Sequence, residues 1–255
     1  MRAGFVILNG SVIILYMPRS RDPARIDAIV GAASQLFVQM GFERTRIHRV
    51  ADLARVSPGT VYLYAEDKEA LFELAVLRSL ESPLARDPLI PYQKTDLSSR
   101  RALLTDCLRE VIHFPQLWVG AQRRSVGEAR EEYYGILLEI CRWVRRYRTA
   151  ILLSDRNRLH WPVLAEEFEK VVWTDLHRRL TGYIDSRIRA GRLLPAGDPA
   201  MVARFTLDAL VAVLVTGPLS QPADFGQPDD EVIAGLAAAG LVGSRDGLPL
   251  PPHPR

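Results

Sequence analysis

Apolar positions recur with helical spacing along most of the chain. The i, i+3, i+4 and i+7 spacing of one buried helix face is followed by Ile26, Ile29, Val30, Ala33, Leu36, Phe37 and Met40. Asp22 followed by Pro23 is a favoured helix start, and Gly41 is a favoured stop. The pattern therefore predicts a helix over residues 23–40.

Three shorter helical segments follow this first helix. Thr45 is placed to cap a helix that ends near Ala54, and Ser57 is placed to cap a third helix just after it. Asp67 is placed to cap a fourth helix. Two short helices joined by a tight turn are the layout of a helix-turn-helix unit, which we place at about residues 46–65.

Helical periods resume after a loop that contains proline and serine. The expected helices cover residues 97–113, 115–126, 128–154, 162–190 and 199–216. No run with the alternation of a strand interrupts them, so the predicted fold class is all-α. The tail, residues 218–255, is rich in proline, glycine and aspartate, and we expect one small helix in it near 229–240.

The apolar stretch near the start needs a separate account. "FVILNGSVIILYM" is too short for a comfortable transmembrane helix and lacks the order of features in a signal peptide. We expect residues 1–21 to be an extension that is either disordered or absent from the native protein, with Met17 as the physiological start. Membrane anchoring through this stretch depends on the same start site.

Composition limits the classes of protein that the chain can be. Its 255 residues are 48% apolar and 25% charged, enough to bury a sizeable core. The net charge of +3 permits contact with nucleic acid without requiring it. Between residues 46 and 64, however, Arg46, Arg49 and Arg55 face only Asp52, and a basic face of this kind can follow DNA phosphates.

Motifs for catalysis or metal binding are absent from the sequence. Cys107 and Cys141 lack the spacing of a metal or disulfide framework, which fits a reducing compartment and a packing role. His113, His160 and His177 lack the spacing of a zinc site, and the sequence contains no P-loop, GxGxxG or GxSxG. We therefore expect no enzyme, no cofactor and no metal.

The stretch "TRIHRVADLARVSPGTVYLYAEDKEALF" resembles the DNA-binding signature of TetR-family transcriptional regulators. The resemblance covers about residues 23–83 and rests on fixed offsets. They are Gly41-Phe42, Thr45, Val50-Ala51, Val56-Ser57, Gly59-Thr60, Tyr62, Tyr64 and Lys68-Glu69. It implies a three-helix DNA-binding domain at residues 22–83, joined by a fourth helix to a larger helical domain for effector binding and dimerisation at residues 84–217.

The resemblance also implies roles for individual residues. The expected DNA-binding set is Thr45, Arg46, Ser57, Pro58, Gly59, Thr60, Tyr62, Tyr64 and Lys68. In this set Arg46, Pro58, Thr60 and Tyr62 lie nearest to base edges, and the others position the helix on phosphates. For Thr45 and Ser57 the plain alternative is a helix cap alone, and Tyr64 is divided between packing and a phosphate contact.

Two positions depart from the usual family pattern. Arg55 stands at a turn position commonly held by glycine, which is costly if that backbone angle is positive. Ala65 stands where an aromatic residue usually follows the second tyrosine, which removes part of the packing behind the third helix.

Beyond residue 85 the resemblance implies two further surfaces. An apolar effector pocket would be lined by Trp118, Tyr134, Trp143, Tyr147, Phe168 and Trp173. A dimer interface between the last two long helices would use Tyr183, Arg187, Phe205, Leu210 and Leu214. Ordinary core packing is the alternative for the aromatic residues, and burial within one subunit is the alternative for the last helix.

These implications combine into one functional hypothesis. The chain would be a cytoplasmic homodimer, without membrane contact, that represses transcription by binding a palindromic operator in double-stranded DNA. A small apolar or amphipathic effector, whose identity the sequence does not reveal, would release it. The alternative is an activator or architectural DNA-binding protein of the same fold that responds to no effector.

Overall fold

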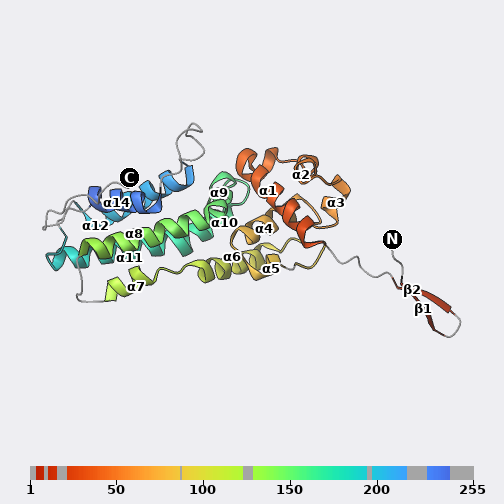
Figure 1. Cartoon of the computed structure of the whole chain (residues 1–255), viewed down its shortest axis with the longest axis horizontal. Coiled ribbons are helices and arrows are strands. Elements are labelled where there is room, and N and C mark those ends of the chain that lie inside the picture. Colours follow the sequence, from red (N-terminus) through yellow and green to blue (C-terminus); the bar gives the residue numbers. More distant parts are fainter. Residues whose placement is uncertain are drawn as a thin grey trace.

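The computed structural model describes residues 4–8, 11–15, 22–86, 88–122, 129–193, 197–216 and 229–241. Apart from one hairpin, the regular structure in these ranges is helical, and the all-α class is confirmed (Figure 1). The hairpin, which was not expected, pairs β1 (Gly4–Leu8) with β2 (Ser11–Leu15) in antiparallel register, Gly4 opposite Leu15. That Met17 is the native start stays a prediction.

Four helices form a compact unit at one end of the molecule, which we call the head. They are α1 (Pro23–Arg44), α2 (Ile47–Leu53), α3 (Pro58–Tyr62) and α4 (Lys68–Ser79). Gly41 breaks α1 with φ of 78° and ψ of 168°, which confirms the expected stop although helical residues follow it. Three aromatic side chains hold the helices together, because Phe37 lies 5.0 Å from Phe72 and Phe42 lies 5.6 Å from Phe72 between ring centroids.

Three of the four helix caps that the sequence predicts in the head are present. The carboxylate of Asp22 accepts from Ala24 N–H, Ser57 Oγ accepts from Thr60 N–H at 3.2 Å, and Asp67 accepts from Ala70 N–H at 2.8 Å.

The expected cap at Thr45 is wrong. Its buried hydroxyl donates to the carbonyl of Gly41 at 2.8 Å, and the residue before α2 is Arg46, which makes no side-chain cap. The break at Gly41 leaves a carbonyl near the end of α1, and Thr45 satisfies it instead of the N–H groups of α2.

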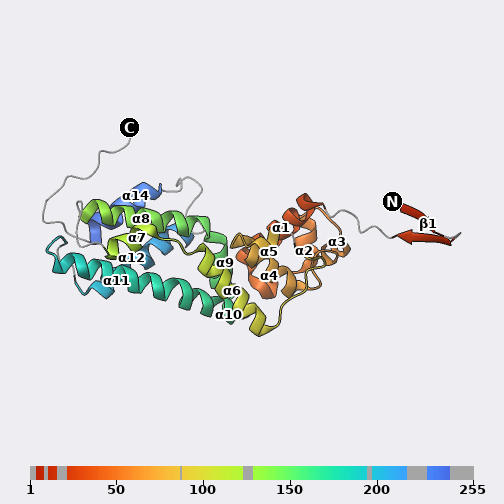
Figure 2. The ribbon, with the colours of Figure 1, turned by 90° about the horizontal axis from the view of Figure 1, so that it is seen from below.

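The remaining helices form the large domain. They are α5 (Pro83–Arg86), α6 (Leu97–Val111), α7 (Pro115–Gln122), α8 (Ala129–Arg146), α9 (Arg148–Arg156), α10 (Pro162–Glu167), η1 (Phe168–Trp173), α11 (Thr174–Arg189), α12 (Pro199–Val211), η2 (Ala212–Thr216) and α14 (Asp230–Leu241). Long helices α8 and α11 both extend away from the head (Figures 1 and 2). Helix α8 packs mainly against α14, and α11 packs against α12 and α7.

Two expected helices differ in detail from those observed. The segment expected at residues 128–154 is interrupted at Tyr147, where α8 ends and α9 begins. The segments expected at 162–190 and 199–216 are continuous, but each contains a π-helical stretch, η1 and η2. An extra residue per turn widens a helix locally, and such stretches recur at functional sites.

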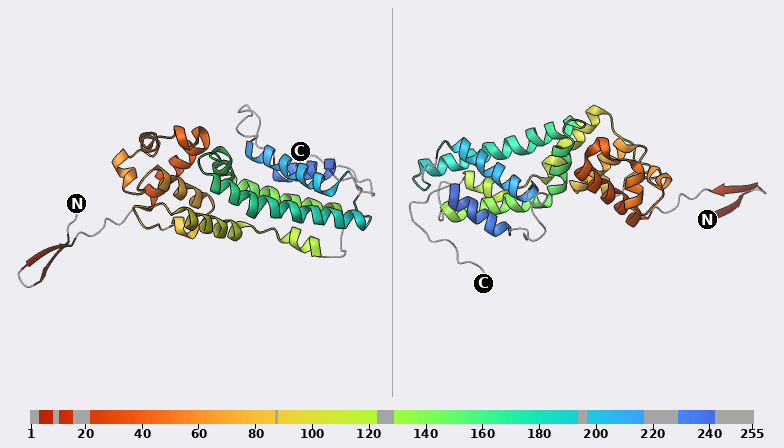
Figure 3. Two further views of the ribbon diagram at one scale, coloured as in Figure 1. Left: turned by 180° about the vertical axis from the view of Figure 1, so that it is seen from behind. Right: turned by 90° about the horizontal axis from the view of Figure 1, so that it is seen from above.

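The small helix expected near residues 229–240 is confirmed as α14. It packs along α8 and also contacts α12, as the views in Figure 3 show. Ile233 and Ala234 are buried there, and Asp230 forms an ion pair with Arg145 at 2.6 Å. The helix is therefore part of the packed body of the large domain.

A buried carboxylate ties the head to the large domain. Glu73 of α4 accepts from Tyr92 Oη at 2.7 Å and from Thr95 Oγ1 at 2.9 Å, and it pairs with Arg100 Nε at 2.8 Å. Burial, and then the hydrogen bond to Glu73, raise the pKa of Tyr92 well above its usual range. The phenol therefore stays a donor, and the loop before α6 is fastened to α4.

None of the described helices is long and apolar enough to cross a membrane. Across the same described ranges, His, Cys, Asp and Glu side chains nowhere gather into a group of three or more that could hold a metal ion.

Candidate DNA-binding interface

Helix α3 presents one face to solvent and anchors the other in the head. Val61 is buried, whereas Tyr62 is 50% exposed. Gly59 and Tyr62 lie well away from Val61 around the helix, and both are exposed, as is Pro58 at the start of α3. A short helix held this way can enter a DNA major groove, which is wide enough to admit one helix.

The turn between α2 and α3 is closed by Arg55 in a left-handed conformation, with φ of 55°. Val56 N–H donates to Ala51 O at 2.9 Å, which satisfies the end of α2. For a residue with a Cβ this conformation costs about 1–2 kcal/mol, so the departure from glycine carries strain. The second departure is milder, because Ala65 is buried and pairs with Tyr92 in a short parallel bridge.

Three arginines stand on the surface of α2 and the residues next to it. Arg46, Arg49 and Arg55 are exposed, and within the described part of the chain none of them forms an ion pair. Arg49 Nη1 donates to the sulfur of Met40 at 3.5 Å. His48 is exposed beside Arg49 on α2 and was not among the expected site residues. Val50 and Ala51 are the buried residues of α2, and their apolar character in the sequence could have indicated that His48 is on the exposed side.

Small polar groups lie at the start of α3. Ser57 Oγ and Thr60 Oγ1 are 2.8 Å apart, and Ser57 is exposed. A Cβ placed on Gly59 would meet nothing closer than Ser57 Oγ at 4.0 Å, so the outer side of this backbone is open to a ligand. Ser57, Pro58, Gly59 and Tyr62 are exposed at α3, and Thr60 among them is partly exposed. The three exposed arginines lie on α2 or next to one of its ends.

Three expected residues point elsewhere. Thr45 is fully buried, and Tyr64 is buried while its carbonyl accepts from Tyr92 N–H at 2.8 Å. Lys68 Nζ donates to the carbonyl of Phe42 at 3.0 Å and lies 4.2 Å from the centroid of the Phe42 ring. These side chains hold the head together from behind the exposed surface.

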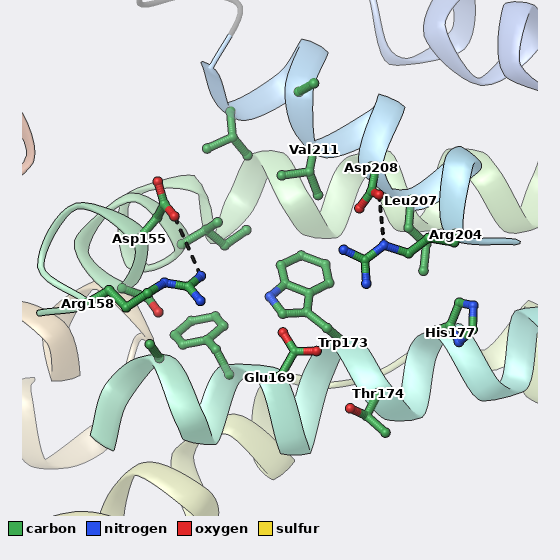
Figure 4. A pocket seen from close by; sticks show the side chains of 16 residues that line it. Asp155, Arg158, Glu169, Trp173, Thr174, His177, Arg204, Leu207, Asp208 and Val211 are labelled. Carbon is green, nitrogen blue, oxygen red and sulfur yellow. Dashed lines mark hydrogen bonds and ion pairs between the residues drawn. The ribbon is translucent and has the colours of Figure 1, made fainter. Parts of the chain in front are cut away.

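A cavity of about 440 Å³ lies in the large domain between α9, η1, α11, α12 and η2 (Figure 4). Phe168 and Trp173 supply aromatic walls. Charged side chains surround them from several elements: Asp155, Arg158, Glu169, Arg204 and Asp208, of which Arg204 pairs with Asp208 at 2.8 Å. Both π-helical stretches contribute to the lining, so the cavity lies where the two long helices are locally widened.

The expected pocket residues are only partly gathered. Trp143 packs on Tyr147 with centroids 5.2 Å apart and on Trp173 at 6.1 Å, but Trp143 and Tyr147 are buried behind the cavity and do not line it. Trp118 lies on α7 against His113, and Tyr134 lies beside α14 near Gly235. Phe168 and Trp173 are the two expected residues that line the cavity.

The expected interface residues divide as well. Tyr183, Arg187, Leu210 and Leu214 are all buried within their own chain, and Arg187 forms a two-pronged ion pair with Glu132. Phe205 alone of the five is exposed, at 60%. Met201 and Val213 are exposed on the same helical run, so α12 and η2 present an apolar strip to solvent that sequence reasoning did not separate from the core.

Comparisons with known proteins agree with this architecture. Residues 29–75 match the model of bacterial regulatory proteins of the tetR family. The transcriptional regulator UidR of Escherichia coli is 24% identical over 236 residues, covering 88% of this chain and 97% of UidR. The regulator RutR of the same species is 44% identical over 57 residues, covering 22% of this chain and 26% of RutR.

The fold is also found among solved structures. The ketosteroid transcriptional regulator KstR2 of Mycobacterium tuberculosis superposes with a TM-score of 0.52 at 13% identity, over 87% of this chain and 94% of that one. At this identity the likeness concerns the fold alone. The residues that match the tetR family model contain the helix-turn-helix, and a larger helical domain lies behind them, which supports a TetR-family DNA-binding transcriptional regulator.

Proposed function

We propose that this regulator is a homodimeric repressor whose two heads bind a palindromic operator and whose release is triggered by a small amphipathic effector. The observation that carries the proposal is the exposed surface of α2 and α3. It presents Tyr62 and the start of α3, together with three arginines on or next to α2 that have no carboxylate partner among the described residues. Arginines without a carboxylate partner are available to DNA phosphates. When they bind the phosphates, the counterions condensed on DNA are released, which favours binding.

The proposed contacts follow the side chains that reach solvent. Pro58, Thr60 and Tyr62 would meet base edges, since they lie on α3, and Arg46, which precedes α2, would join them as the family resemblance implies. Ser57 and the backbone at Gly59 would bind phosphates, together with Arg49 and Arg55. Thr45 and Lys68 would act by holding the head rigid, because the Thr45 hydroxyl and the Lys68 ammonium bond to carbonyls of α1. Tyr64 would act by packing, because its side chain is buried.

The experiment for DNA binding uses the DNA upstream of the protein's own gene, or a site selected by the wild-type chain from random DNA. Tyr62→Ala is expected to weaken binding by about 1–3 kcal/mol, because a base contact is lost while the head remains folded. Tyr134→Phe, in the large domain, is the matched control. If the wild-type chain prefers no DNA sequence, or if Tyr62→Ala binds equally well, the proposed surface is wrong.

Dimerisation is proposed through the apolar strip of Met201, Phe205 and Val213. Exposed apolar side chains in a row are stabilised by burial against a second copy, at about 25 cal/mol per Å² of apolar surface. Phe205→Arg should therefore yield a monomer in sedimentation velocity, with its helical circular dichroism intact. A monomeric wild-type chain, or a variant that remains dimeric, would reject this interface.

The effector is proposed to occupy the cavity beside Trp173. Its aromatic walls and charged rim suit a molecule with an apolar body and at least one polar group. A compound that binds should change the fluorescence of Trp173, lose that signal in Trp173→Phe, and lower operator affinity. If compounds of this class bind but leave operator affinity unchanged, the effector-independent activator or architectural protein becomes the better description.

A further inference from the structure

One buried side chain joins the head to the large domain. Asn157 follows α9, is fully buried, and donates through Nδ2 to the carbonyl of Leu153 at 2.8 Å in its own domain. The same Nδ2 lies 3.4 Å from the carbonyl of Phe37, and Oδ1 accepts from Phe42 N–H at 2.6 Å. A single amide therefore holds two backbone groups of α1 against the end of α9.

The break in α1 makes this contact available. Gly41 has a positive φ of 78°, and the N–H of the next residue, Phe42, bonds to Asn157 outside the helix. A Cβ on Gly41 would lie 3.9 Å from Arg156 O and from Asn157 Oδ1, so the two backbones pass close together at this point. The contact fixes both the position and the direction of the end of α1.

The turn that follows Asn157 also holds α4. The ring centroid of Trp161 lies 4.6 Å from that of Phe72 on α4. The guanidinium of Arg100 lies over the same Trp161 ring, 4.2 Å from its centroid. Arg100 is in turn paired with Glu73 of α4. The five residues 157–161 thus contact both of the long helices on which α2 and α3 are built.

The segment that clamps the head also forms a wall of the cavity. Ile151, Ser154 and Asp155 on α9, with Arg158 just beyond it, line the cavity that contains Trp173 (Figure 4). Asn157 lies between Asp155 and Arg158 in the chain but faces the head instead. Because Asn157 directly follows α9, a shift of the end of α9 on the cavity side would also displace the clamp.

We propose that Asn157 is the positioning residue that fixes the angle of the head for operator binding, and that this clamp passes the state of the cavity to α1. The inference rests on the proposed DNA-binding function. Two heads must enter successive major grooves about 34–36 Å apart, so a freely turning head loses the second contact while keeping the first. Asn157 does not touch DNA in this scheme and acts only through Phe37 and Phe42.

The test separates head geometry from stability. The operator is first selected from random DNA by the wild-type full-length chain. Binding is then measured to the full operator, to one half-site, and to operators with base pairs inserted between the half-sites. The variants are Asn157→Ala and the smaller change Asn157→Ser, and the control is Ile233→Ala, a core truncation in α14 on the far side of the large domain.

Asn157→Ala should weaken binding to the full operator by about tenfold or more, because it leaves a buried N–H without its acceptor and frees the head. Half-site binding should equal that of the wild-type chain, and the dependence on half-site spacing should flatten. Ile233→Ala should lower thermal stability without changing the preferred spacing. If Asn157→Ala does not fold, Asn157→Ser is expected to show the same pattern to a smaller extent.

Two failures are distinguishable. If the wild-type chain selects no operator, the proposed function fails before any variant is examined. If the wild-type chain binds but the Asn157 variants lose half-site and full-site binding in equal proportion, or keep the spacing preference of the wild type, then Asn157 is a stabilising residue only and the inference is overturned.

Discussion

Many arginines of the large domain are used differently from the three arginines on and next to α2 in the head. In the large domain, Arg101, Arg145, Arg146, Arg178, Arg179, Arg187, Arg189 and Arg204 each have a carboxylate partner within 2.9 Å. On and next to α2, Arg46, Arg49 and Arg55 have no carboxylate partner among the described residues. Paired arginines fasten helices to one another, whereas unpaired ones leave their charge available to a polyanion.

The largest effect should come from breaking the ion pair of Arg187, the most buried arginine among the ion pairs of the described residues. Glu132→Ala leaves Arg187 buried without the carboxylate that binds it through Nε and Nη2 at 2.9 Å each. We expect a loss of about 3–5 kcal/mol in the free energy of unfolding, measured by denaturant titration. Glu131→Ala, an exposed neighbour, is the control, and similar stability of the two variants would contradict the structural role assigned to this pair.

The second prediction contrasts one arginine from each part. Arg46→Ala should lower the salt dependence of operator binding by about one phosphate contact, a slope change of about 0.9. Arg146→Ala, which removes the partner of Glu81, should leave that slope unchanged. The measurement is operator affinity over a series of salt concentrations, and equal slopes for Arg46→Ala and the wild type would remove Arg46 from the proposed contacts.

The third prediction concerns Ser57, whose hydroxyl is both a cap and a candidate phosphate contact. Ser57→Ala should destabilise the head by about 1 kcal/mol, because Thr60 N–H loses its acceptor. Ser57→Asp keeps the cap and should keep the stability, yet it places a negative charge toward DNA and should weaken binding. Thermal unfolding and operator affinity together test this, and unchanged affinity in Ser57→Asp would make the residue a cap alone.

The smallest effect is expected at Arg55, where strain and charge oppose each other. Arg55→Gly should raise the free energy of unfolding by about 0.5 kcal/mol, since relief of the left-handed strain is partly offset by the greater freedom of glycine in the unfolded chain. Operator binding should weaken, because a cation beside the groove is lost. Lower stability in Arg55→Gly would show that φ of 55° is not strained in this turn.

The difference between the parts also explains what the sequence could predict. In the head, local chemistry determines the elements: Asp22, Ser57 and Asp67 cap helices within a few residues of themselves, and Gly41 breaks α1. The exposed face of α3 follows from the same short-range periodicity, as the burial of Val61 beside exposed Tyr62 illustrates.

Long-range choices were not predictable in this way. Periodicity placed Tyr183 and Leu210 on apolar faces but did not indicate whether the face meets the same chain or another surface. The Thr45 hydroxyl bonds to the carbonyl of Gly41, which precedes it, and not to the N–H groups of α2, which follow it. The two π-helical stretches at the cavity were not predicted either. Asn157 bonds to a residue 115 positions away, which no local pattern encodes.

One unexpected element did have a local signal. The dipeptide Asn9-Gly10 separates two runs rich in valine and isoleucine, which is a strong hairpin signal, and β1 and β2 lie on either side of it.

The position of α14 has a practical consequence for anyone who shortens the gene. A stop codon placed after residue 216 would keep all the helices of the two domains expected from the sequence, which end at residue 217, and would remove α14. It would also strip Ile233, Ala234 and Ala238 from the flank of α8 and leave Arg145 without Asp230. The shortened product would expose the apolar surface of α8 that α14 covers. We expect it to precipitate during purification at a concentration at which the full-length chain stays in solution.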